Sequence, residues 1–206
     1  MDQKATDIIH RAMGVFMRCG IKSVNMDDIS RQLGISKKTL YKYVADKSDL
    51  VKKAIQFHCD TEDRQLKEIS EKKLNAIDES FEMMRMVLNM IGDVHPSVLY
   101  DLQKYHPTLM KEMETERHRI IYQSLKENME RGVKEGWYRE DIKPDIVASF
   151  YVSSVEAIFH KLSFVETEYS FQQLYTELFR MHIRGIASEK GIAYLVQKMK
   201  TEQHAN

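Results

Sequence analysis

The segment NMDDISRQLGISKKTLYKYVADKSDL, residues 25–50, predicts two short helices joined by a tight turn, followed by the start of a longer helix. Asn25 suits the cap of the first helix, and Asp27 and Asp28 place carboxylates in its first turn, where the helix dipole favours them. Gly34 ends this helix, because glycine readily adopts the positive φ needed there. Ser36 can then cap the second helix. The segment therefore predicts two helices held around a fixed turn.

The second helix, expected from Lys37 to about Tyr43, has one apolar side and one polar side. Only Leu40 and Val44 are available for a core. The other side carries cations, a hydroxyl and phenols: Lys37, Lys38, Thr39, Tyr41, Lys42 and Tyr43. Lysines neutralise phosphates, while threonine and tyrosine reach backbone oxygens or base edges. This composition favours a helix that recognises DNA.

The same run resembles the helix-turn-helix of the TetR family of bacterial transcriptional regulators, whose pattern is roughly I-A-x-x-A-G-V-S-x-G-T-L-Y-x-Y/H-F-x-x-K-E-x-L. The match extends without a gap from Ile29 to Leu50. Two departures from the family pattern matter: Lys38 replaces a usual glycine, and Val44 replaces a usual phenylalanine. Val44, which is smaller than phenylalanine, only reduces a contact in the core. Lys38 adds charge where the family's backbone often approaches DNA closely, so a family operator sequence does not transfer to this chain.

The resemblance implies an all-α protein. Residues 1–46 are expected to form a three-helix helix-turn-helix domain. A continuous helix beginning at Lys47 would join it to a helical ligand-binding and dimerisation domain, residues 47–206. The expected phosphate contacts are Ser36, Tyr41, Lys42 and Lys47, and the side chains expected nearest to base edges are Lys37, Lys38, Thr39 and Tyr43.

The charge distribution supports a DNA-binding end. The formal net charge is zero, but residues 1–53 contain 11 Lys/Arg and 6 Asp/Glu, a balance of +5, and the remainder carries −5. A basic module on an acidic body is the asymmetry expected when one end meets phosphate. A solvated basic surface without a partner is the alternative, and the motif argues against it.

The remaining sequence predicts helices and no strand longer than a few residues. Helical periodicity of apolar residues covers residues 5–19, 47–69, 75–91, a short stretch after Pro96, 108–135, 144–162, 171–186 and 191–199. No proline or glycine interrupts residues 47–69, so this helix is expected to connect the two domains. The phrase from Gly136 to Asp141 is a second, weaker match to the family, which places such a turn before its penultimate helix.

The helices at 144–162 and 171–186 are apolar around much of their circumference, and such helices need partners on two sides. One side can pack within the subunit and the other can form a dimer. This agrees with the family, whose last two long helices form a four-helix bundle across a twofold axis. A wholly internal core is the alternative. The candidate interface residues are Val147, Tyr151, Val155, Ile158, Leu174, Leu178, Phe179 and Ile183.

The resemblance also implies a pocket for a small-molecule effector in the body. Its candidate lining comes from the middle helices, with Tyr151 or Glu156 as polar contacts: Phe81, Met84, Leu88, Tyr100, Tyr105, Met113, Ile121, Phe150, Tyr151 and Glu156. Ordinary core packing is the alternative for each of them.

No nucleotide-binding, hydrolase or metalloprotease motif occurs, so the sequence predicts neither an enzyme nor a cofactor or metal site. Cys19 and Cys59 form no disulfide framework and suit a reducing compartment. No signal peptide and no run of about 20 apolar residues is present, which predicts a soluble cytoplasmic protein without a membrane partner.

The sequence thus predicts a homodimeric, ligand-responsive transcriptional repressor that binds double-stranded DNA at a pseudo-palindromic operator. The alternative is a helical ligand-binding or scaffolding dimer without sequence-specific DNA binding. Lys38 in place of the usual glycine is the feature that favours this alternative.

Overall fold

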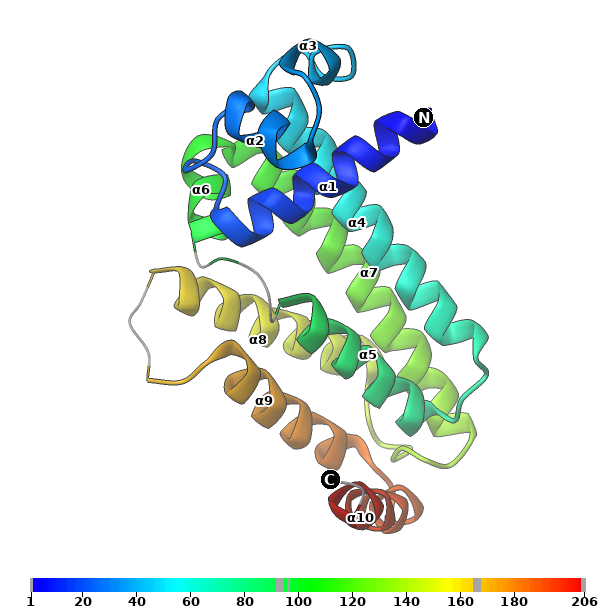
Figure 1. The fold of residues 1–206 in the computed structure, drawn as a ribbon. Helices are drawn as coiled ribbons and strands as arrows, with labels where there is room; N and C mark the ends of the chain where they lie inside the picture. Colours follow the sequence, from blue (N-terminus) through cyan, green and yellow to red (C-terminus); the bar gives the residue numbers. More distant parts are fainter. Residues whose placement is uncertain (1, 92–94, 96, 165–167, 205–206) are drawn as a thin grey trace. The chain divides into compact units, whose positions relative to one another are not determined.

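The computed structural model describes residues 2–91, 95, 97–164 and 168–204, and for residues 160–164 and 199–204 it describes the backbone alone. In this part of the chain helices follow one another through short turns (Figure 1). Their bounds are α1 Gln3–Cys19, α2 Met26–Leu33, α3 Lys37–Leu40, α4 Lys47–Glu71, α5 Ala76–Ile91, α6 Ser97–Tyr105, α7 Pro107–Lys134, α8 Pro144–Phe164, α9 Phe171–Ile186 and α10 Glu189–His204. Within the described residues, β-type pairing is limited to an isolated antiparallel bridge between Tyr138 and Ala187. The predicted all-α class is confirmed.

Two helices differ in length from the sequence-based expectation. The second helix of the motif, expected to reach Tyr43, is α-helical only to Leu40 and continues as a tight turn. The amide groups of Lys42 and Tyr43 donate to carbonyls three residues back, which tightens this last turn. At the other end of the chain, α10 runs to His204, beyond the expected residue 199.

The chain divides into two compact units. Unit 1 consists of residues 1–64 and 90–117, and unit 2 consists of residues 65–89 and 118–206. Helices α4 and α7 each contain residues of both units. The expected assignment of residues 1–46 to DNA binding and of residues 47–206 to ligand binding and dimerisation is a functional division and stays a prediction.

The core of unit 1 joins the N-terminal helices to later ones. Buried side chains of α1 to α4, such as Ile8, Ile29 and Leu40, pack in one cluster with Val98 and Leu102 of α6. The turn between α1 and α2 also meets α6 through a polar contact, because the buried carboxylate of Asp101 accepts a hydrogen bond from the backbone amide of Lys22 at 2.8 Å. The N-terminal helices are therefore supported by α6, which periodicity in the sequence could not assign to them.

Unit 2 contains α8 and α9, which pack side by side (Figure 1). The turn after α7 is pinned to the end of α9: the amide of Arg139 donates to the carbonyl of Ile186, and the amide of Ser188 donates to the carbonyl of Trp137, both at 2.9 Å. These bonds flank the Tyr138–Ala187 bridge and fix where α10 begins.

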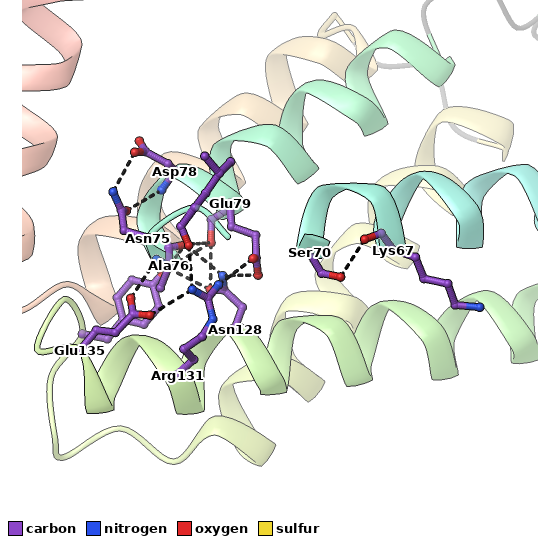
Figure 2. A network of polar contacts seen from close by, with 12 residues as sticks. Lys67, Ser70, Asn75, Ala76, Asp78, Glu79, Asn128, Arg131 and Glu135 are labelled. Carbon is purple, nitrogen blue, oxygen red and sulfur yellow. Dashed lines mark hydrogen bonds and ion pairs between the residues drawn. The ribbon is translucent and has the colours of Figure 1, made fainter. Parts of the chain in front are cut away.

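A buried polar cluster ties the start of α5 to α7 in unit 2, and Figure 2 shows most of its members. The carbonyl of Ala76 accepts hydrogen bonds from Asn128 Nδ2 and the Tyr138 hydroxyl, each at 2.9 Å. Asn128 Nδ2 also donates to Glu79 Oε1, and Arg131 pairs with the second oxygen of Glu79 at 2.6 Å. Burial raises the pKa of Tyr138, so its hydroxyl remains a donor. Because the side chains named here are joined by hydrogen bonds and an ion pair, the cluster stabilises one register of α5 on α7.

No helix in the described ranges is both long and apolar enough to cross a membrane.

Candidate nucleic-acid interface

Helix α2 is fixed at both ends by short-range hydrogen bonds. Asn25 Oδ1 accepts from the amides of Asp27 and Asp28 at 2.9 and 3.0 Å, and Asp28 returns a bond to the amide of Asn25, which completes a capping box. At the other end Gly34 has φ 66°, a left-handed conformation that suits glycine. The guanidinium of Arg11 in α1 also donates to the carbonyl of Leu33 at 2.5 Å. The direction in which the chain leaves α2 is thus determined by its caps.

The cap of α3 is Ser36. Its Oγ accepts from the amide of Thr39 at 3.0 Å, and the two hydroxyls lie 2.8 Å apart. Leu40 is buried and Tyr41, the next residue, is exposed. The predicted division of this helix into one buried leucine and a polar outer face is therefore present in the structure.

The start of α4 is held against the end of α3. Two carboxylates cap α4: Asp46 Oδ1 accepts from the amide of Asp49 at 2.8 Å, and Asp49 Oδ2 accepts from the amide of Ala45 at 2.9 Å. Lys53 Nζ bonds both Asp49 Oδ2 at 2.8 Å and the carbonyl of Tyr43 at 2.9 Å. The hydrogen bond from Lys53 is the main cause that lowers the pKa of Asp49. This lysine bridges the end of the α3 turn to α4 and so fixes the spacing between the two elements.

Two of the predicted DNA-contacting lysines have shifted pKa values. Lys37 Nζ lies 3.0 Å from Asp27, and this hydrogen bond raises the pKa of the ammonium group. Lys47 is half-buried at the start of α4, and burial lowers its pKa, an effect that the carboxylates of Asp101 and Asp28 oppose. Both lysines lie at helix starts, where the dipole disfavours a cation. Asp27 already offsets this cost at Lys37, and a phosphate would offset it at Lys47.

The eight predicted DNA-contacting residues lie on α3, its N-cap Ser36, the following turn and the start of α4 in unit 1. Five of them are exposed: Ser36, Lys37, Lys38, Tyr41 and Lys42. Thr39, Tyr43 and Lys47 are partly buried, and the ring of Tyr43 packs against the core of unit 1.

The predicted dimer residues separate into two groups. Four are buried within the single subunit: Tyr151, Val155, Phe179 and Ile183. The other four are half-buried: Val147, Ile158, Leu174 and Leu178. Among the side chains of these helices that the structure describes, the most exposed large apolar ones are Phe150 and Met181, with 71% and 72% of their surface accessible. The sequence predicted Phe150 only as a residue of the ligand pocket, and it predicted Met181 neither for the pocket nor for the dimer interface.

The predicted ligand residues are distributed over both units. Tyr100, Tyr105 and Met113 belong to unit 1, where Met113 is part of the core and the two tyrosines are exposed. In unit 2, Phe81 and Tyr151 are buried, Phe150 is exposed, and Met84, Leu88, Ile121 and Glu156 are half-buried. Glu156 pairs with His118 at 2.8 Å.

Sequence reasoning missed the residues that position the motif. Arg11 and Lys53 hold it through bonds to distant carbonyls, which leave no local pattern in the sequence. The cap formed by Asp46 and Asp49 does leave a signal, because two acidic residues spaced three apart are typical of a helix start. The arrangement as a whole is a capped helix-turn-helix with a cationic, hydroxyl-bearing outer face, which defines a DNA-binding protein.

Comparison with known proteins agrees with this class. Residues 8–54 match the family model described as "Bacterial regulatory proteins, tetR family". The HTH-type transcriptional regulator YvaF of Bacillus subtilis (strain 168) is 24% identical over 141 residues, which cover 66% of this chain and 72% of YvaF. Residues 8–54 are therefore a DNA-binding region of the TetR type.

Solved structures share the fold over almost the whole chain. A transcriptional regulator from Cytophaga hutchinsonii ATCC 33406 has a TM-score of 0.72 at 18% identity and covers 91% of this chain and 100% of its own. A putative transcriptional regulator from Saccharomonospora viridis, solved in complex with choline, has a TM-score of 0.71 at 19% identity and covers 92% and 100%. At these identities the likeness is one of fold.

Proposed function

We propose that this protein is a ligand-responsive repressor that binds a pseudo-palindromic operator as a homodimer in the cytoplasm. The observation that carries the proposal is the outer face of α3 and its following turn, where Lys37, Lys38, Tyr41 and Lys42 are all exposed. Caps at Asn25, Ser36 and Asp46 hold this face rigidly. A rigid cationic face reads DNA at a lower entropic cost than a mobile one.

Each subunit would place α3 in a major groove, with half-sites separated by about one helical turn or a multiple of it. Ser36, Tyr41, Lys42 and Lys47 would contact phosphates, and these contacts set the position of the module on the duplex. Lys37, Lys38, Thr39 and Tyr43 would lie nearest to base edges. The Thr39 hydroxyl, which lies 2.8 Å from Ser36 Oγ, would reach DNA only as part of that pair.

The dimer surface we propose combines exposed and half-buried apolar side chains of α8 and α9. Ile146 and Phe150 lie one turn apart on α8, and both are exposed. Leu174, Leu178 and Met181 follow a spacing of four and three residues on α9, so they share one face of that helix. An apolar patch of this kind on a soluble domain is typical of an interaction site.

Regulation would follow from a ligand in the body that favours a separation of the two DNA-binding modules unsuited to the operator. Helix α4 contains residues of both units and is the element we propose to transmit the change. Couplings of this kind are typically worth about 1–3 kcal/mol. The half-buried apolar residues of unit 2, Met84, Leu88 and Ile121, are the pocket candidates we retain.

The test is fluorescence anisotropy with the DNA upstream of the protein's own gene, at several salt concentrations and with unrelated duplex as competitor. Binding that resists the competitor and weakens steeply with salt supports the proposal. Lys47→Ala and Tyr41→Phe should both weaken it, whereas Lys111→Ala, which removes an exposed lysine of α7 in the same unit, should not. Two results together would favour the helical dimer without sequence-specific DNA binding: the upstream DNA binds no better than the competitor, and selection of genomic fragments then yields no preferred sequence.

A further inference from the structure

The two helices of the motif are joined by one ion pair on their exposed side. The ammonium of Lys37, the first residue of α3, lies 3.0 Å from each carboxylate oxygen of Asp27, in the first turn of α2. The side chains of Lys37 and Asp27 are 49% and 60% exposed. Ion pairs this exposed contribute little to folding stability. Stability of the fold is therefore a weak explanation for this carboxylate.

The pair changes what Lys37 can do on DNA. A lysine free of partners is a flexible point charge that meets phosphate on any sequence, and each phosphate neutralised strengthens binding without regard to base identity. Pairing with Asp27 cancels the net charge at this point and restrains the ammonium. The ammonium has three donors, so it can keep the carboxylate and still donate to an acceptor such as guanine O6 or N7.

The side chain of Asp27 is not needed for the capping of α2. The capping box of α2 uses the side chains of Asn25 and Asp28, and Asp27 contributes to it only through its backbone amide. A carboxylate in the first turn also suits the helix dipole. Replacing Asp27 by asparagine should therefore leave α2 folded.

We propose that Asp27 is a specificity-determining residue, which acts by positioning Lys37 and by preventing it from serving as a general phosphate contact. The inference rests on the DNA-binding function proposed above. Without the carboxylate, Lys37 gains a phosphate on any duplex, so affinity for unrelated DNA rises and discrimination falls.

The first measurement compares Asp27→Asn with Asp7→Asn. Asp7 forms a similar exposed ion pair with Arg11 in the same unit, with side chains 58% and 45% exposed, so both variants add one positive charge. The probes are a duplex selected from a random library by the wild-type protein and a duplex of the same composition in shuffled order. For Asp27→Asn we expect about fivefold tighter binding to the shuffled duplex near 0.15 M salt, with a salt slope steeper by about 0.9. Asp7→Asn should leave the ratio of the two affinities within about twofold, as expected for a charge away from the contact.

The second measurement repeats Asp27→Asn in a Lys37→Gln background. If Asp27 acts through Lys37, its replacement has no further effect there, and Asp27→Glu in the wild-type background preserves discrimination. An effect that survives Lys37→Gln, or an Asp27→Asn variant that behaves like Asp7→Asn, overturns the inference while leaving DNA recognition intact. A wild-type protein that does not prefer its selected duplex overturns both proposals.

Discussion

At the residue scale, Gly34 makes the sharpest stability prediction. Its φ of 66° is left-handed, and a Cβ placed there meets no other atom within 4 Å, so only backbone strain opposes a side chain. Gly34→Ala should lower the free energy of unfolding by about 1 kcal/mol. Gly185→Ala is the matched control: this glycine also has open space but lies in the last turn of α9 without a positive φ, and alanine there should stabilise by up to about 0.5 kcal/mol. Denaturant unfolding measures the change in the free energy of unfolding for each variant. Changes of the same sign in the two variants would contradict the explanation.

His182 predicts a pH dependence of stability. Its ring lies 4.3 Å from that of Tyr151, and burial lowers its pKa to about 4. The folded protein therefore keeps His182 neutral, while the unfolded chain takes up a proton near the ordinary pKa of about 6.5. Neutral His182 therefore contributes on the order of 3 kcal/mol to the free energy of unfolding above about pH 6.5. This contribution is lost as the pH falls to 4.

The test is the free energy of unfolding of His182→Phe across this pH range, with His182→Gln as a second non-titrating variant. Both should lose less stability than the wild-type protein between pH 6.5 and pH 4. Curves that run parallel to the wild type would show that His182 is not the group responsible.

At the scale of elements, the polar cluster between α5 and α7 predicts graded losses of stability. Tyr138→Phe removes one of the donors to the Ala76 carbonyl, and Asn128 and Ser80 still bond it, so the cost should be about 1 kcal/mol. Asn128→Ala also removes a donor to buried Glu79 and should cost about 2–3 kcal/mol. Gln123→Ala, at an exposed position of α7, should change stability by less than about 0.5 kcal/mol. Thermal and denaturant unfolding would rank the variants, and an inverted order would contradict this account of the cluster.

Elements with local signals were predictable from the sequence. The caps at Asn25, Gly34 and Ser36 depend on residues within three or four positions of each other, and the structure shows all three. The turn after α3 was not predictable in the same way, because Lys53 of α4, ten residues further on, bonds the carbonyl of Tyr43. The contact between Asp101 and the α1–α2 turn joins residues 79 positions apart, and no periodicity reports such a contact.

At the scale of the whole molecule, five of the eight predicted DNA-contacting residues are exposed, whereas four of the eight predicted dimer residues are buried within the subunit. In α8 and α9 apolar residues occupy several faces, so periodicity cannot tell which face packs inside the subunit. The structure resolves this ambiguity for one subunit: Tyr151 and Phe179 are buried, while Phe150 and Met181 are exposed. Of these four side chains, Phe150 and Met181 are the two available to a partner without disturbing the fold of the subunit.

The dimer proposal therefore predicts that Phe150→Glu combined with Met181→Glu yields a folded monomer. Two carboxylates in the centre of an apolar interface would be desolvated without partners, which is costly. Because a dimer engages two half-sites through one assembly, its loss should weaken operator binding by about a hundredfold or more. Ile192→Glu combined with Val196→Glu is the control, since these α10 residues are also exposed and apolar but lie outside the proposed surface. Sedimentation velocity and anisotropy on the same samples give both readouts. A double variant on α8 and α9 that stays dimeric would move the interface elsewhere, and a monomer with undiminished operator affinity would remove the need for a twofold operator.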